Sequence, residues 1–413
     1  MPTELYENLE APKKAVLAAV DTGEYDVETS LEELRELART AGYPVVGTAT
    51  QKLQSPVAAT FMGSGRLLEL KEYLEAVEAD LIIFDEELSP AQLRNIEELC
   101  DCPVLDRTML ILDIFAKNAQ SSEGKLQVEL AQLKYMYPRL KGKGEALSRL
   151  GGGIGTRGPG ESQLETDRRH IRRRIDYLES KLKNIETRRS LLSERRKKNA
   201  VKTIALVGYT NTGKSTLLNL LTQSDVFVKD QLFATLDPTS RKMEIDDVEF
   251  MLIDTVGFLK NLPHDLIDAF HSTLESALNC DLALIVCDAT GEYEMQLKTT
   301  LDTLDALHFN APYIVVMNKS ETLRDFEGYP TDAVFISAKE NLGTEVLKRE
   351  ILKRFQNDYV FCSLRVPYRS VSDYNANKKY LKERNIIFND FGMLIDAVIP
   401  AMYISKFHDF IDR

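Results

Sequence analysis

The segment that most constrains the fold is the octapeptide GYTNTGKS at positions 208–215. It fits the pattern G-x-x-x-x-G-K-[ST], and it lies directly between the apolar run KTIALV and the apolar helical pattern STLLNLL. Between a strand and a helix, the glycines of such a loop let the backbone wrap around a phosphate. Backbone N–H groups and the helix N-terminus then hold the phosphate charge. The octapeptide therefore predicts an α/β domain that binds a nucleoside triphosphate, and it leaves the base undefined.

The residues of this loop have separate predicted tasks. We expect Lys214 to reach the β- and γ-phosphates and the Ser215 hydroxyl to bind Mg²⁺. The neighbouring positions supply the remaining contacts. The predicted phosphate-binding set is Gly208, Tyr209, Thr210, Asn211, Thr212, Gly213, Lys214, Ser215 and Thr216.

Four further motifs follow in a fixed order. The polar stretch DQLFATLDPTSR (230–241) contains Thr235, a candidate second Mg²⁺ ligand that is ordered only while the γ-phosphate is present. In DTVG (254–257), the Asp254 carboxylate suits the outer coordination of Mg²⁺, and the Gly257 N–H suits contact with the γ-phosphate. NKSE (318–321) and SAK (337–339) complete the set. In this order and context, the set resembles the five sequence elements of a Ras-like GTPase.

The motifs define the candidate site residues. The further nucleotide contacts predicted are Phe233, Ala234, Thr235, Leu236, Asp237, Asp254, Thr255, Val256, Gly257, Asn318, Lys319, Ser320, Glu321, Ser337, Ala338 and Lys339. The predicted catalytic residues are Lys214, Thr235, Gly257 and Asn211. The predicted metal ligands are Ser215, Thr235 and, in the outer coordination, Asp254.

Two positions depart from the GTPase pattern. The base-reading motif N-K-x-D has Glu321 in place of its aspartate, which keeps the carboxylate that accepts hydrogen bonds from guanine but adds a methylene. We still expect GTP rather than ATP, because Asn318, Lys319 and the loop at Ser337 remain. Phe258 follows the glycine of DTVG, where many such enzymes have a glutamine that orients the attacking water. Unassisted hydrolysis should therefore be slow.

Asn211 allows two interpretations. In several GTPases that lack the glutamine, an asparagine three positions before the lysine holds a K⁺ ion near the bond that joins the β- and γ-phosphates. Alternatively, Asn211 closes the loop by a local side-chain hydrogen bond. The sequence does not separate these two.

A second unusual segment precedes the phosphate loop. Nineteen residues, Gly142–Gly160, contain eight of the chain's 21 glycines, and residues 139–200 carry 18 Lys/Arg against 8 Asp/Glu. This segment is therefore +10 in a chain of net charge −12, which leaves −22 for the remainder. Apolar residues at spacings of three and four on both sides of the glycines predict an antiparallel helical hairpin with a basic tip. Such a tip favours a polyanionic partner over a merely solvated helix pair.

Alternating strand and helix patterns organise the rest of the chain, so the predicted fold class is α/β. We predict an N-terminal α/β domain (1–118), a projecting hairpin arm (119–200), a Ras-like P-loop domain with a mostly parallel sheet (201–356) and a small C-terminal α/β domain (357–413). The sequence contains no apolar run long enough to span a membrane and no signal-peptide pattern. We therefore expect a cytoplasmic location.

Four stretches carry a more specific resemblance. They are GGGIGTRGPGESQLETDRRHIRRRI (151–175), GYTNTGKSTLLN, FATLDPTSR and DTVGF, and they resemble the HflX-type GTPases, the ribosome-associated branch of the Obg–HflX superfamily. The resemblance implies binding of GTP, GDP and the large ribosomal subunit, with ribosome splitting or rescue under stress and hydrolysis stimulated by the ribosome. It also implies contact with rRNA near the arm tip. The candidate RNA-binding residues are Arg157, Arg168, Arg169, Arg172, Arg173 and Arg174.

Several alternatives stay open. The N-terminal domain of some HflX-type proteins binds ATP, and the loop FMGSGR (61–66) could meet a phosphate, although an ordinary strand–helix turn is the commoner explanation. The chain could instead be a slowly hydrolysing adaptor that holds ribosomes apart, which Phe258 favours. A GTPase of an RNA-modification complex is a further alternative, and the lack of a cysteine in the final FHDFIDR counts against it. An arm that threads RNA suggests a monomer in action.

Overall fold

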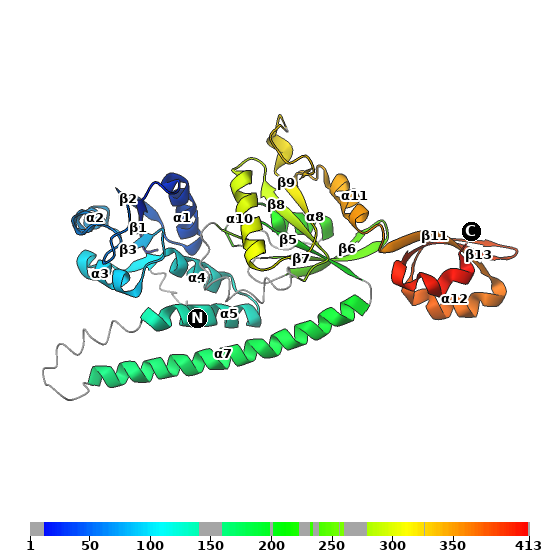
Figure 1. Ribbon diagram of the computed structural model, residues 1–413, viewed down its shortest axis with the longest axis horizontal. Helices are drawn as coiled ribbons and strands as arrows, with labels where there is room; N and C mark the ends of the chain where they lie inside the picture. Colours follow the sequence, from blue (N-terminus) through cyan, green and yellow to red (C-terminus); the bar gives the residue numbers. More distant parts are fainter. Residues whose placement is uncertain are drawn as a thin grey trace, which may run out of the picture. The chain divides into compact units, whose positions relative to one another are not determined.

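The computed structural model describes residues 12–139, 159–198, 201–222, 232–233, 239–255, 257–259, 279–325 and 327–411. Contacts divide the chain into two compact units. One contains Met1–Glu186, Asp230–Asp237 and Asn261–His271, and the other contains Thr187–Lys229, Pro238–Lys260 and Ser272–Arg413. Figure 1 shows the elements of both.

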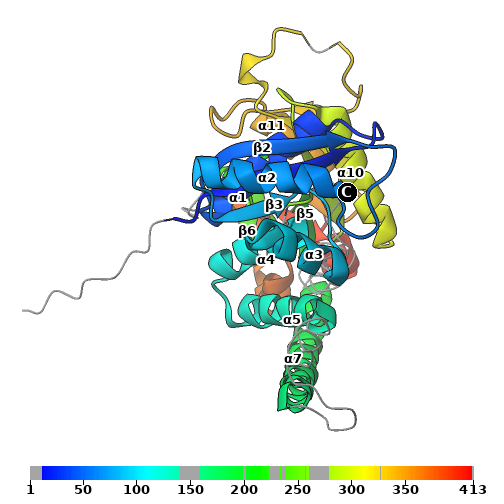
Figure 2. The same ribbon diagram turned by 90° about the vertical axis from the view of Figure 1, so that its left-hand side faces the viewer.

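The first unit contains a four-stranded parallel sheet of order β2-β1-β3-β4. Its strands are β1 (Ala15–Asp21), β2 (Val45–Lys52), β3 (Leu81–Phe84) and β4 (Val104–Asp106). Helices α1 and α4 contact each other and cover one face of this sheet. Helices α2 and α3 contact each other and cover the opposite face (Figure 2). These helices are α1 (Val27–Ala41), α2 (Ser64–Val77), α3 (Pro90–Cys100) and α4 (Arg107–Asn118).

Helix ends in this unit follow local chemistry. Helix α3 begins with a capping box, in which the Ser89 hydroxyl accepts from the Gln92 N–H and the Gln92 side chain accepts from the Ser89 N–H. Helix α1 ends at Gly42, whose φ of +84° is the left-handed conformation that glycine adopts without strain.

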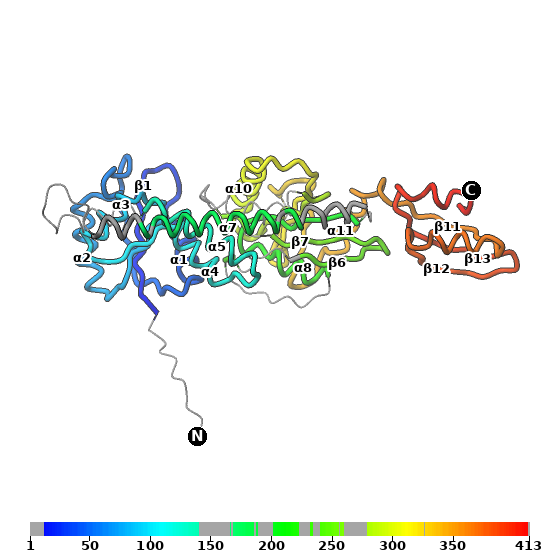
Figure 3. Tube along the Cα trace, turned by 90° about the horizontal axis from the view of Figure 1, so that it is seen from below, coloured from blue at the N-terminus to red at the C-terminus, as the bar shows by residue number. Residues whose placement is uncertain are grey.

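The predicted hairpin is formed in this unit by two further helices, the second of which continues past Glu186 into the other unit. Helices α5 (Ser122–Arg139) and α7 (Pro159–Lys198) lie side by side in Figures 1 and 3. They run antiparallel, since Arg174 pairs with Glu129 and Arg168 lies over the Tyr137 ring. Leu178 of the predicted apolar stripe is fully buried. The glycine-rich residues 140–158 between the helices lie outside the described part of the chain.

The second unit contains a six-stranded sheet of order β10-β9-β8-β5-β7-β6, in which only β6 is antiparallel to its neighbour. The strands are β5 (Lys202–Val207), β6 (Thr239–Ile245), β7 (Val248–Asp254), β8 (Leu282–Asp288), β9 (Tyr313–Asn318) and β10 (Val334–Phe335). Helices α8 and α11 pack on one face and α10 on the other. Their bounds are Lys214–Thr222 (α8), Tyr293–Ala306 (α10) and Thr344–Arg354 (α11).

The same unit ends in a small antiparallel sheet of order β11-β13-β12. Its strands are β11 (Tyr359–Pro367), β12 (Lys382–Asn389) and β13 (Gly392–Pro400), and α12 (Val371–Asn377) and the 3₁₀ helix η5 (Ala401–Phe410) pack against them. The other 3₁₀ turns are η2 (Ser320–Thr322), η3 (Tyr368–Ser370) and η4 (Lys378–Tyr380). The predicted α/β class, with a mostly parallel central sheet, is therefore confirmed. Within the described ranges, no helix is both long and apolar enough to cross a membrane.

Candidate nucleotide-binding site

The predicted motifs meet at one edge of the six-stranded sheet. The loop 208–213 follows β5, Asp254 is the last residue of β7, and Asn318 is the last residue of β9. Strand β5 pairs with both β7 and β8, and β8 pairs with β9. Because the carboxyl ends of parallel strands meet at one edge, the phosphate and base motifs lie together at that edge.

The phosphate loop surrounds the amine of Lys214. Its Nζ donates to the carbonyl oxygens of Gly208 at 3.1 Å and Tyr209 at 2.6 Å, and the residue is only 6% exposed. Gly213 has φ of +89°, and a Cβ there would collide with the Asn318 side chain. The loop therefore requires glycine at this position. Thr212 is buried, and its hydroxyl donates to the Tyr209 carbonyl, so its side chain supports the loop.

The residues predicted to hold Mg²⁺ lie together. The Ser215 hydroxyl donates to Oδ2 of Asp254 at 2.7 Å, and Asp254 is 1% exposed. Hydroxyl and carboxylate oxygens are ligands that Mg²⁺ prefers, so this pair fits the ion. Among the described residues, no group of three or more His, Cys, Asp or Glu could form a metal site.

The DTVG glycine lies directly against the phosphate loop. A Cβ on Gly257 would come within 2.8 Å of the Thr210 Cα and 3.0 Å of the Lys214 Nζ. The next residue fixes this approach: the Phe258 N–H donates to the Gly208 carbonyl at 3.0 Å, and the Thr210 N–H donates to the Phe258 carbonyl at 2.9 Å. The Phe258 side chain is 2% exposed and packs in the core. Thr255, also buried, donates its hydroxyl to the Leu206 carbonyl.

Asn318 joins three loops of the site. Its Nδ2 donates to the Thr212 carbonyl at 2.7 Å, and its Oδ1 accepts from the Ala338 N–H at 2.9 Å. The side chain is 3% exposed, so both bonds are shielded from water. The phosphate loop, the NKSE motif and the SAK motif are therefore connected through one amide. Ser337, which is fully buried, supports the SAK loop by accepting the Glu340 N–H.

The three residues after Asn318 in NKSE are exposed to solvent or form hydrogen bonds with side chains and carbonyls of neighbouring loops. Lys319 has φ of +63°, and its Nζ donates to Oδ2 of Asp288 at 2.6 Å. Burial raises the pKa of Asp288, but hydrogen bonds from Lys319 and Thr290 outweigh burial and leave the pKa below its ordinary value. Glu321 lies in the turn η2 and is exposed. Lys339 and Asn211, in other loops, are also exposed. Ser320 is half-buried and donates to the Ile336 carbonyl.

Sequence reasoning missed Asp288. The available signal was its position at the end of the buried strand LALIVCD, at the same sheet edge as Asp254 and Asn318. Other predicted residues lie outside the described part of the chain. These are Ala234, Thr235, Leu236, Asp237, Val256 and Arg157.

The arginines predicted to contact RNA divide into two groups on α7. Arg174 forms a two-pronged ion pair with Glu129, at 2.7 and 2.8 Å, and the Arg168 guanidinium lies 5.2 Å from the Tyr137 ring centroid. These two side chains therefore contact α5 across the hairpin. Arg169, Arg172 and Arg173 are exposed, and their spacing of three and four places them on one face of the helix.

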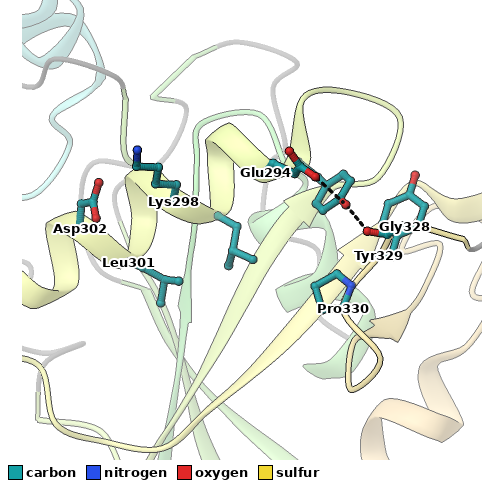
Figure 4. A pocket seen from close by; sticks show the side chains of 9 residues that line it. Glu294, Lys298, Leu301, Asp302, Gly328, Tyr329 and Pro330 are labelled. Atoms are coloured by element: carbon teal, nitrogen blue, oxygen red, sulfur yellow. Dashed lines mark hydrogen bonds between the residues drawn. The ribbon is translucent and has the colours of Figure 1, made fainter.

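Two other regions have features that ligand sites share, a glycine loop before a helix and a surface pocket. At the loop FMGSGR, Gly63 precedes α2, and its N–H already donates to Gln51 at 2.8 Å. A pocket of about 460 Å³ lies on α10 beside Gly328, Tyr329 and Pro330 (Figure 4). Glu294, Lys298 and Asp302 alternate in charge along its helical side, and none of the predicted nucleotide residues lines it.

The phosphate loop, the Ser215–Asp254 pair, the close glycine and the asparagine-lysine base motif on this sheet define a P-loop GTPase of the Ras-like type. Three family models match the chain: "GTP-binding GTPase N-terminal" over residues 28–116, "GTP-binding GTPase Middle Region" over 118–196 and "50S ribosome-binding GTPase" over 203–319. Family members use Mg²⁺.

Curated relatives give the particular family. The GTPase HflX of Caldanaerobacter subterraneus subsp. tengcongensis is 46% identical over 406 residues, covering 97% of this chain and 94% of the relative. The GTPase HflX of Escherichia coli K12 is 42% identical over 376 residues, covering 88% of each chain. A GTP-binding protein of Sulfolobus solfataricus, solved in complex with GDP, is 26% identical with a TM-score of 0.45 and covers 84% of this chain and 99% of its own. The chain belongs to the HflX family of GTPases, and it binds GTP and hydrolyses it to GDP and phosphate.

Nucleotide affinity should fall above about pH 8. Burial lowers the pKa of Lys214 to about 8, and the Asp254 carboxylate opposes this only in part. Because a bound phosphate favours the charged ammonium, binding takes up a proton wherever Lys214 of the free protein is neutral. We expect the dissociation constant for GDP to be flat below pH 8 and to rise by up to about tenfold between pH 8 and 9. Calorimetry in buffers of different ionisation enthalpy measures the uptake, and binding at pH 9 without proton uptake would contradict the prediction.

Proposed function

We propose that this chain is a GTP-controlled ribosome factor. In its GTP-bound form it binds the large ribosomal subunit, places the tip of the hairpin α5–α7 against rRNA, and splits or rescues ribosomes under stress. The ribosome in turn stimulates hydrolysis. The observation that carries this proposal is the exposed arginine face of α7, formed by Arg169, Arg172 and Arg173 in a chain of net charge −12. The "50S ribosome-binding GTPase" model that matches residues 203–319 supports the same partner.

The proposed nucleotide chemistry uses the residues of the site in separate tasks. Lys214 binds the β- and γ-phosphates, and Gly257 donates its N–H to the γ-phosphate. Ser215 and Thr235 would hold Mg²⁺ directly and Asp254 through its outer coordination, where the ion neutralises charge on the phosphates. Glu321 accepts the guanine hydrogen bonds from its exposed position. The remaining predicted loop residues line the nucleotide.

Asn211 is the proposed K⁺ site. Its side chain is exposed, and its backbone φ of +59° turns the loop sharply at this point. Within the described part of the chain, the side chain makes no hydrogen bond of the kind that would close the loop locally. A cation beside Asn211 would place positive charge near the bond that is cleaved. The buried phenyl side chain of Phe258 supplies no such charge.

The remaining proposals concern organisation. We infer four parts, at 1–118, 119–200, 201–356 and 357–413, that act together as a monomer on the ribosome. ATP binding at the N-terminal domain rests on the loop 61–66 alone. The second candidate function is a slowly hydrolysing adaptor. The burial of Phe258 favours it, because the side chain directly after Gly257 packs in the core and cannot orient an attacking water.

The test is steady-state hydrolysis in potassium buffer, with purified large ribosomal subunits added or omitted and with ATP in parallel. We expect the subunits to stimulate turnover of GTP at least tenfold and to leave ATP unaffected. Replacement of potassium by sodium should reduce the rate if Asn211 holds K⁺. Equal turnover with and without subunits would favour the adaptor, and equal turnover of ATP would remove the guanine assignment.

Charge reversal on the arginine face should separate ribosome binding from nucleotide chemistry. The triple variant Arg169→Glu/Arg172→Glu/Arg173→Glu should lose ribosome stimulation by about a factor of ten or more, because each lost phosphate contact weakens binding and its salt dependence. Its hydrolysis without ribosomes should be unchanged. Reversal at Arg349 and Arg354 of α11 provides a matched basic control. Stimulation retained by the triple variant would exclude α7 as the RNA-binding face.

A further inference from the structure

Asp288 lies beside the base motif NKSE at the edge of the six-stranded sheet. It is the last residue of β8, and its register partner is Asn318, the last residue of β9. The Ala289 N–H donates to the Asn318 carbonyl at 2.9 Å, so the backbone pairing continues past Asp288. The segment that follows β8 is therefore held against the start of NKSE.

The two oxygens of the Asp288 carboxylate have different partners. Oδ1 accepts from the N–H of Thr290 at 2.9 Å and from its hydroxyl at 2.6 Å, which closes a local turn. Oδ2 accepts from the Lys319 Nζ at 2.6 Å. The backbone of Asp288 is fixed as well, because its N–H donates to Oε1 of Gln296 on α10 at 2.8 Å. One oxygen therefore fixes the carboxylate, and the other binds the lysine of the base motif.

The ion pair restricts Lys319 more than it stabilises the fold. The Asp288 side chain is 17% exposed and that of Lys319 is 36% exposed, so solvent screens the pair in part. Pairs of this kind contribute little to the free energy of unfolding. A free lysine side chain, however, has many rotamers, and it loses them when it is ordered. The Asp288 carboxylate therefore orders the lysine before any ligand is present.

We propose that Asp288 is a positioning residue for the guanine end of the nucleotide. It holds the ammonium of Lys319, so that the apolar stem of the lysine lies ready to cover the base without a further loss of rotamers. This inference rests on the proposed placement of the base at NKSE. It gives a residue outside the five sequence elements of the GTPase a part in the affinity for both GTP and GDP.

The variant Asp288→Asn tests this role with a small change. The two donors of Thr290 keep the amide oxygen on the turn, so the amide NH₂ faces the Lys319 ammonium, and neither group can accept. The turn is kept while the lysine is released. With the full chain and saturating Mg²⁺, we expect the dissociation constants for fluorescent GDP and for a fluorescent non-hydrolysable GTP analogue each to rise about fivefold. In hydrolysis the loss should appear in KM for GTP and not in kcat.

A double-mutant cycle shows whether Lys319 carries the effect. Lys319→Met keeps a long apolar side chain and removes the charge that Asp288 binds. Alone, it should weaken both nucleotides at least about fivefold, because the side chain is no longer held. In that background Asp288→Asn should add less than about twofold, since its partner is already absent. A residue that acted only on the fold would weaken binding by the same factor in both backgrounds.

The same unit offers a matched ion pair as a control. Lys202 and Asp358 pair at 2.7 Å, with side chains that are 26% and 39% exposed, and neither belongs to a nucleotide motif. Asp358→Asn should leave both dissociation constants within about twofold of the wild type. The thermal unfolding of the nucleotide-free chain should change equally little in Asp358→Asn and Asp288→Asn, because each variant loses one partly exposed pair.

The outcomes separate this inference from the proposed function. If Lys319→Met leaves both dissociation constants unchanged, the proposed placement of the base at NKSE fails. If Lys319→Met weakens both nucleotides while Asp288→Asn behaves like Asp358→Asn, the positioning role is wrong and the proposed nucleotide chemistry stands. An undiminished effect of Asp288→Asn in the Lys319→Met background, or a gain in affinity from Asp288→Asn alone, would also overturn the inference.

Discussion

Replacing Lys214 with alanine should reduce kcat/KM for GTP hydrolysis about a thousandfold, which corresponds to roughly 4 kcal/mol of lost transition-state stabilisation. The reason is the placement of the amine. Lys214 is buried within its own loop, and two loop carbonyls fix its Nζ, so its charge acts on the phosphates in a site of low dielectric constant. Steady-state hydrolysis and fluorescent-nucleotide binding would measure the effect.

A matched lysine controls for general effects of removing a side chain. Lys202 at the start of β5 pairs with Asp358 at 2.7 Å in the same unit and is not part of the phosphate loop. Lys202→Ala should leave kcat/KM within about twofold. Lys214→Ala also removes a buried amine, so its folding must be checked. We expect its thermal unfolding to be as cooperative as that of the wild type. Hydrolysis retained by Lys214→Ala within tenfold would contradict the assignment of the phosphate site.

The second large effect is expected at Gly257. A methyl group there would lie 2.8 Å from the Thr210 Cα, which is backbone and cannot rotate away. The DTVG segment or the phosphate loop must then shift, and the Gly257 N–H loses its position relative to the γ-phosphate. For Gly257→Ala we expect hydrolysis to fall about a hundredfold while affinity for GDP changes little, since GDP lacks the γ-phosphate that we propose this N–H contacts. Single-turnover hydrolysis combined with GDP titration measures both.

Gly291 is the corresponding control. A Cβ at that position would approach the Gln296 side chain at 3.4 Å, an ordinary contact with a flexible group. Gly291→Ala should therefore hydrolyse GTP at the wild-type rate. A hundredfold loss of GDP affinity in Gly257→Ala would indicate collapse of the phosphate loop and would refute the specific role of the glycine.

The phosphate loop and the fold class could be predicted from the sequence because their chemistry is local. A glycine-rich loop has its function only between a strand and a helix, and the structure places Lys214 at that junction. The same holds for α3, whose start is encoded by the adjacent Ser89 and Pro90. Such features depend on residues a few positions apart, so a single sequence carries the complete signal.

The parts that escaped prediction depend on distant partners. Asn318 donates to Thr212, which lies 106 positions earlier, and Phe233 accepts from Asn118 across 115 positions. In the sequence, Arg174 is equivalent to the neighbouring arginines of the basic run. In the structure it forms an ion pair with Glu129 on the other helix. No periodicity or motif encodes these pairings. They are set by the way strands and helices assemble, which propensity and spacing do not specify.

The amide of Asn318 has a consequence for how this enzyme can diverge. Because one buried side chain closes the phosphate loop onto the SAK loop, any change at Asn318 alters both ends of the nucleotide at once. Glu321 lies three positions later on an exposed turn, where an added methylene disturbs no packed neighbour. Mutational freedom is therefore unevenly distributed within a single four-residue motif. The carboxylate that we propose reads the base can vary in length, while the residue that joins the loops of the site cannot.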